Sequence, residues 1–215
     1  MNINENLENI YSSHISDLSD FSVKFTNENL QGPLCIRVKE YIDEPLKLMC
    51  VGQETYGWDQ SLSIKDQLNS YEGFNFGSNY KSTPFWNVIR KVECALGVRP
   101  HSIAWSNLNR FDQNVGAPVG AVLEEIAKFD CILRKEIEVL QPDICILFTN
   151  HKYDNRLKNM YKGLVFEDID GLPPTHFSKL THPLLPNITI RAPHPKTIRT
   201  QFWEGAFIEY IEKLA

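Results

Sequence analysis

The sequence predicts an α/β protein built in three layers, with a four-stranded, mainly parallel central sheet between helices. Short apolar runs, typical of strands buried on both faces, recur along the chain. Stretches with apolar residues three or four positions apart separate these runs, as in helices that cover a sheet. This alternation indicates βαβ units and a parallel sheet. The apolar runs occupy residues 46–51, 102–106, 143–148 and 187–192.

The first 45 residues are predicted to be a helical and connecting segment that precedes the first strand. Leu7, Ile10 and Leu18 have the spacing of the apolar face of an amphipathic helix within residues 1–30. Pro33 and Pro45 then mark a connection that leads into the sheet.

Three further helices are predicted. Thr83 and Pro84 form a typical helix start, and this helix ends at Gly97. Apolar residues repeat at helical spacing from Gly120 to Leu140, which predicts one continuous helix. A last helix begins at about Thr200.

Two stretches have a less regular pattern. Residues 57–82 are rich in glycine, asparagine and serine and are predicted to be a loop that carries aromatic side chains. Residues 152–186 are predicted to contain a short helix at 153–161 and a β excursion that turns near Gly171.

Composition indicates an ordinary globular protein. The chain has 215 residues, of which 42% are hydrophobic and 23% charged, and its net charge is -5. We expect one domain over residues 1–215 and a monomer. We also expect a cytoplasmic location, because no apolar run has the length of a membrane span or a signal peptide. The five cysteines are odd in number and lack a CxxC pair, which predicts buried reduced thiols and no metal site.

Each predicted strand ends in a polar sequence: GQETY, SNLN, FTNH and APHPK. In a parallel sheet these ends meet at one edge, where ligands of α/β proteins usually bind. The edge would hold a carboxylate (Glu54), carboxamides (Asn107 and Asn150) and a histidine (His194). Amides pair with the edge of a polar heterocycle, a carboxylate orients water, and a histidine stabilises a developing anion. The plainer alternative is that these residues cap turns and helix starts.

The order and character of these motifs resemble the uracil-DNA glycosylase superfamily. In its best-known branch the first strand leads into GQDPYH, the second ends in asparagine, and a late strand leads into HPSPLS. This chain has GQETYG at 52–57 and HPKT at 194–197, with Asn107 after the second strand. The resemblance covers about residues 45–212. It implies a uracil-DNA glycosylase-like fold and release of uracil or a related base from DNA, with no cofactor and no metal.

The resemblance also implies roles for five residues. Glu54 matches the carboxylate that positions the hydrolytic water, and His194 matches the histidine that stabilises the departing base. Asn107 matches the asparagine that binds the uracil ring edge. Gln53 matches the residue whose backbone contacts the base, and Tyr56 matches the tyrosine that excludes a 5-methyl group.

Other parts of the expected site are less defined. Phe74 or Phe76 could be the stacking phenylalanine, although these rings could instead attach their loop to the core. Lys196 and Arg199 are candidate contacts to phosphates of single- or double-stranded DNA. The apolar wedge that displaces a base in the family has only Ile198 as a candidate.

The two signature motifs depart from the family pattern at four positions. Glu54 replaces aspartate, Thr55 replaces proline, Gly57 replaces histidine and Lys196 replaces serine. Two alternatives therefore stay open beside uracil release from DNA. The protein could act on another modified base or a nucleoside, or it could bind nucleic acid or protein without catalysis.

Overall fold

The fold is taken from a computed structural model, which describes residues 2–74 and 81–215. The chain forms two compact units whose segments alternate along the sequence. Unit 1 comprises Met1–Val38, Gly52–Phe74 and Trp105–Leu140. Unit 2 comprises Lys39–Val51, Asn75–Ala104 and Gln141–Ala215.

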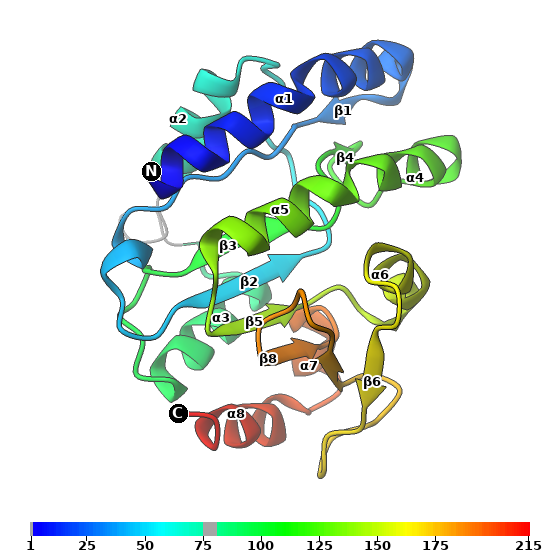
Figure 1. The fold of residues 1–215 in the computed structure, drawn as a ribbon. Coiled ribbons are helices and arrows are strands. Elements are labelled where there is room, and N and C mark those ends of the chain that lie inside the picture. Colours follow the sequence, from blue (N-terminus) through cyan, green and yellow to red (C-terminus); the bar gives the residue numbers. More distant parts are fainter. Residues whose placement is uncertain (1, 75–80) are drawn as a thin grey trace. The chain divides into compact units, whose positions relative to one another are not determined.

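Unit 1 is mainly helical. The helix α1 lies against α5, as Figure 1 shows, and buries one apolar stripe with Leu7, Tyr11 and Phe21. Asn2 begins α1 with a reciprocal capping box that includes Glu5. The elements of unit 1 are α1 (Ile3–Lys24), η1 (Thr26–Glu28), β1 (Leu30–Gln31), α2 (Ile64–Phe74), β3 (Ala104–Asn107, from Trp105 on), β4 (Asp112–Gln113), α4 (Gly120–Ile126), η3 (Ala127–Phe129) and α5 (Asp130–Leu140).

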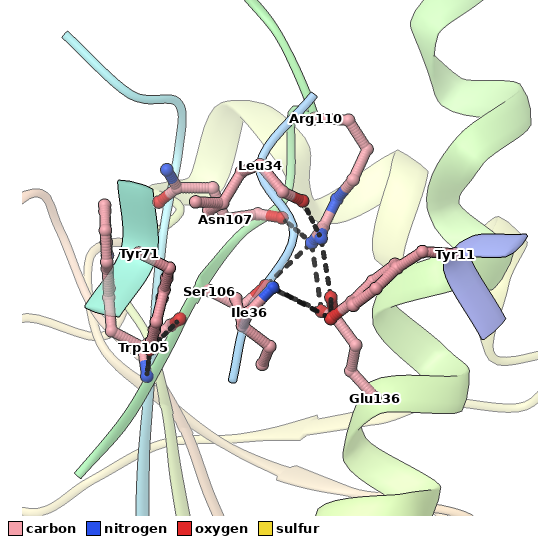
Figure 2. A network of polar contacts seen from close by, with 9 residues as sticks. All are labelled: Tyr11, Leu34, Ile36, Tyr71, Trp105, Ser106, Asn107, Arg110 and Glu136. Atoms are coloured by element: carbon pink, nitrogen blue, oxygen red, sulfur yellow. Dashed lines mark hydrogen bonds and ion pairs between the residues drawn. The ribbon is translucent and has the colours of Figure 1, made fainter. Parts of the chain in front are cut away.

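A buried ion pair lies at the centre of unit 1 (Figure 2). The guanidinium group of Arg110 binds both carboxylate oxygens of Glu136, at 2.7 and 3.1 Å, and both side chains are inaccessible to solvent. The Tyr11 hydroxyl donates to the same carboxylate at 2.8 Å and accepts from the Ile36 amide at 3.0 Å. The pair therefore joins α1, α5, the segment around Ile36 and the residues after β3.

Unit 2 contains the central sheet, in the order β2-β5-β8-β7-β6. Strands β2, β5 and β8 are parallel, with Leu48 opposite Ile144 and Ile144 opposite Ile188. Strands β7 and β6 continue the sheet in antiparallel pairing. The elements are η2 (Glu40–Asp43), β2 (Leu48–Gly52, to Val51), α3 (Pro84–Ala95), β5 (Ile144–Leu147), η4 (His151–Tyr153), α6 (Asp154–Met160), β6 (Val165–Glu167), β7 (Ser178–Thr181), β8 (Ile188–Arg191), α7 (Pro195–Thr200) and α8 (Glu204–Glu212).

The helices of unit 2 cover a strongly apolar sheet. All five residues of β2 and all four of β5 are buried, which explains the unbroken apolar runs of the sequence. Helix α3 packs against α7 and α8, and the ring of Phe207 in α8 contacts Phe148 and Phe177. The predicted α/β class, with a mainly parallel sheet flanked by helices, is confirmed.

Three predictions about elements need correction. The sheet has more than four strands, because the hairpin of β6 and β7 joins it. Residues 64–74 of the predicted loop form α2, whose buried residues include Leu68, Tyr71 and a polar Gln67. The helix expected over 120–140 is interrupted at η3, a 3₁₀ turn that begins after the buried Ile126 and ends at the buried Phe129.

The cysteines are all free thiols. Cys35, Cys50 and Cys145 are buried as predicted, whereas Cys94 is exposed and Cys131 is half-buried. Among the helices that the structure describes, none is long and apolar enough to cross a membrane.

The buried ion pair leads to a stability prediction. Replacing Glu136 by Ala leaves the Arg110 charge buried without its partner, which is expected to lower the free energy of unfolding by about 3–5 kcal/mol. Chemical denaturation would measure the change. The matched control is Glu138→Ala on the exposed side of the same helix, with an expected change of about 0.5 kcal/mol or less. Equal effects in the two variants would contradict the assignment.

Candidate functional site

Two of the predicted strand ends are bound to each other within unit 1. The backbone amide of Leu108 donates to the carbonyl of Gly52 at 3.0 Å, and the amide of Asn109 donates to the carbonyl of Gln53 at 2.7 Å. The sequences GQE and SNLN therefore lie side by side, as the sequence led us to expect. The Gln53 side chain is buried, and the backbone carbonyl of Gln53 already accepts the hydrogen bond from the Asn109 amide.

The carboxylate of Glu54 is held by a side chain from the neighbouring segment. Asn109 donates from Nδ2 to Oε2 of Glu54 at 3.1 Å. Asn109 is fully buried, whereas Glu54 is half-buried. A charged acceptor strengthens such a bond, so Asn109 fixes the orientation of the carboxylate.

The loop after Glu54 is organised by the buried carboxylate of Asp112. One oxygen, Oδ2, accepts from the Thr55 hydroxyl at 2.7 Å and from the amides of Gly57 and Trp58 at 3.1 and 3.2 Å. In this arrangement the Tyr56 side chain is 84% exposed. Tyr56 therefore lies in solvent and does not form the wall of a pocket in unit 1.

Asn107 has a restrained backbone and an unsatisfied side chain. Arg110 donates from Nη2 to the Asn107 carbonyl and to the Ser106 hydroxyl, the latter at 2.7 Å. In Figure 2 the carboxamide of Asn107 points away from the guanidinium group. The residue is completely buried, and neither carboxamide atom has a hydrogen-bond partner among the described residues. Buried polar groups are rarely left in this state, and each exception requires an explanation.

An aromatic cluster surrounds Trp105, which precedes Asn107 in β3. The ring of Phe74 stacks on Trp105 with centroids 5.3 Å apart, and Tyr71 stacks on Trp105 at 6.0 Å. Trp58 contacts Phe74 and Trp105 and donates from Nε1 to Gln67 at 2.7 Å. Phe74 is thus part of a packed cluster, which favours the attachment role over the stacking role. The other candidate, Phe76, lies outside the described residues.

In unit 2, His194 follows β8 and caps α7. Its Nδ1 accepts from the amide of Lys196 at 3.1 Å, so the neutral ring carries its proton on Nε2. Burial, together with the smaller effect of the positive charges of Lys196 and Lys152, lowers the pKa of His194 to about 4. The imidazole is therefore neutral at pH 7. The ring of Phe85 lies beside it, with centroids 5.7 Å apart.

Other predicted residues of unit 2 have varied surroundings. Asn150 caps η4, because its Oδ1 accepts from the amide of His151 at 2.8 Å. Lys196 is exposed, and Arg199 pairs with Glu204 at 3.1 Å. The wedge candidate Ile198 is wrong, since its side chain is fully buried in the core.

Sequence reasoning missed three residues that shape this site. Asn109 binds Glu54, Asp112 binds the loop at 55–58, and Arg110 holds the Asn107 backbone. Their polar side chains within five residues of Asn107 are the only signal that the sequence offers. Within residues 2–74 and 81–215, no cluster of His, Cys, Asp and Glu has the arrangement to hold a metal ion.

Comparison with family models and with curated proteins finds no match to this chain.

The low pKa of His194 leads to a prediction about pH and stability. The unfolded state binds a proton near pH 6.5, whereas the folded state binds it near pH 4, so stability falls as the pH is lowered through this window. The loss reaches about 3 kcal/mol. We expect His194→Asn to show a shallower fall between pH 6.5 and 4 in urea titrations.

The control for this measurement is Asn155→Ala, which alters an exposed residue of the same unit and removes no titratable group. Its pH dependence should follow that of the wild type. A fall in stability that is as steep in His194→Asn as in the wild type would exclude His194 as the source.

Proposed function

We propose that the protein hydrolyses the N-glycosidic bond of uracil or a related base in DNA. The observation that carries the proposal is the buried Asn107 carboxamide, whose oxygen and nitrogen lack partners among the described residues. Leaving such groups unpaired costs about 1–3 kcal/mol each, a cost that a ligand would remove. A carboxamide offers one acceptor beside one donor, which complements the N–H and C=O along the edge of uracil.

In this reaction Glu54 supplies the carboxylate that stabilises the positive charge on the sugar. Cleavage of a glycosidic bond produces an oxocarbenium-like sugar, which a nearby carboxylate stabilises while it orients water. The bond from Asn109 to Oε2 supports this role, because it limits the positions that the carboxylate can take. Glu54 and Asn107 both belong to unit 1. The backbone hydrogen bonds from residues 108–109 to residues 52–53 hold the segments that carry them side by side.

His194 supplies a donor suited to the negative charge. The departing base leaves as an anion, and a neutral imidazole can donate its Nε2 proton to it in a hydrogen bond. The low pKa of His194 and the amide of Lys196 on Nδ1 favour this neutral tautomer. A base within duplex DNA would have to leave the stack before such groups could contact it.

The first test measures base release from uracil-containing single- and double-stranded DNA, detected as abasic sites. Glu54→Gln and His194→Ala should each lower the single-turnover rate about 100-fold or more. The first removes the carboxylate that stabilises the positive sugar, and the second removes the imidazole that stabilises the anionic base. Glu138→Gln, on the exposed side of α5, serves as the control and should leave the rate unchanged. A folded wild-type protein in excess that releases no uracil would overturn the uracil assignment.

Asn109 provides a second prediction, based on its bond to Glu54. Asn109→Ala should slow base release about 10- to 100-fold in the wild type, the value of a hydrogen bond to a charged group. In the Glu54→Gln background the same change should have little further effect, because Asn109 acts through that carboxylate. Asn155→Ala, on the surface of unit 2, is the control. Equal losses in both backgrounds would show that Asn109 does not act through Glu54.

A further inference from the structure

The residue that follows the C-terminal end of α7 has a backbone conformation that is unfavourable for its residue type. The amide of Trp203 donates to the carbonyl of Ile198 at 2.9 Å, and the amide of Phe202 donates to the carbonyl of Arg199 at 3.2 Å. These two bonds form a Schellman motif, in which the residue at the position of Phe202 is usually glycine. Phe202 has a φ of 59°, a left-handed conformation that is unfavourable for residues with a side chain.

The Phe202 side chain makes the choice more unusual. It is 92% exposed, so its ring contributes little to the packing of unit 2. A phenylalanine here combines backbone strain with an apolar ring in water, and neither helps the chain to fold. Residues that break local rules without a compensating gain in stability concentrate at functional sites.

The surroundings of Phe202 indicate a negatively charged, aromatic ligand. Lys196 and Arg199 are exposed on α7, three residues apart, although Arg199 also pairs with Glu204. The next residue, Trp203, has its ring 4.7 Å from His176, which in turn lies 5.2 Å from His151. Cations beside exposed and half-exposed aromatic rings are the usual composition of surfaces that bind unpaired nucleic acid strands.

We propose that Phe202 is a stacking platform for an unpaired base of a DNA strand whose phosphates lie along Lys196 and Arg199. Stacking on an exposed ring requires a base that has left its own stack, so the surface favours single-stranded or locally opened DNA. The inference rests on the proposed function only for the identity of the ligand, and it adds a contact outside the candidate base site. Ile198 cannot serve in this way because it is buried.

The test separates binding from folding with one substitution. Phe202→Gly gives the Schellman motif its preferred residue, so the melting temperature should rise by about 2–4 °C. The same variant should bind a fluorescent oligothymidine strand about tenfold more weakly in an anisotropy titration. Phe202→Trp, which keeps an aromatic ring, should bind as the wild type does.

The control is Leu184→Ala, which removes another exposed apolar side chain of unit 2 and should leave the affinity unchanged. The strand contains no uracil, so binding is measured without base release. Unchanged binding by Phe202→Gly, or no binding by the wild-type protein, would overturn the stacking proposal. Stronger binding to the matching duplex would overturn the preference for unpaired DNA.

The outcomes also distinguish this inference from the proposed function. Base release with normal binding by Phe202→Gly would leave the glycosylase assignment in place and reject the stacking role. Strand binding that depends on Phe202, without release of any base, would do the reverse. A Phe202→Gly variant that loses self-association instead of DNA affinity would assign the ring to contact with a second copy of the chain.

Discussion

The burial of one positive charge constrains most of unit 1. Arg110 is inaccessible to solvent, and such a charge is tolerated only where a carboxylate and further acceptors surround it. Glu136 provides both carboxylate oxygens, while the carbonyls of Leu34 and Asn107 accept further bonds. The helix that carries Glu136, the segment at 34–36 and the residues after β3 must therefore keep fixed relative positions.

This constraint bears directly on the candidate site. Asn107 is held through its backbone carbonyl, so that its carboxamide does not take part in the network that positions it. Asp112 has a similar relation to the loop at 55–58, where one oxygen binds three donors. Arg110 Nε and Asp112 Oδ1 are single buried atoms without a partner among the described residues, whereas both polar atoms of the Asn107 carboxamide lack one, which makes Asn107 informative. A well-ordered surrounding with one unpaired amide is the state expected of a preorganised binding group.

The sequence predicted the parts of the fold that depend on local patterns. The strands at 46–51 and 143–148 were found because each is buried on both faces, and α1 because its apolar residues have helical spacing. Helix α2 was missed because most of its residues are polar, and the buried Gln67 is stabilised by bonds that only the fold reveals. The interruption at η3 was missed because residues three apart fit both kinds of helix.

The sequence showed which strand ends carry polar side chains, but not the contacts that hold those side chains in place. Polar residues after apolar strands pointed to Glu54, Asn107 and His194 without any knowledge of the fold. The bonds from Asn109 to Glu54 and from Arg110 to Asn107 depend on turns whose geometry a residue pattern does not specify. The exposure of Tyr56 likewise follows from the loop at 55–58, which is held by Asp112, a residue far away in the chain.

The bond between Asn109 and Glu54 also bears on the departure from the aspartate of the family that the sequence resembles. A glutamate has one more rotatable bond than an aspartate, so its carboxylate can take more positions and loses more entropy when it is fixed. A catalytic carboxylate must be held within a fraction of an ångström of its working position. The hydrogen bond from the buried Asn109 supplies a restraint of this kind. The longer acid and the asparagine beside it are therefore best understood as one unit, in which the second residue offsets the freedom of the first.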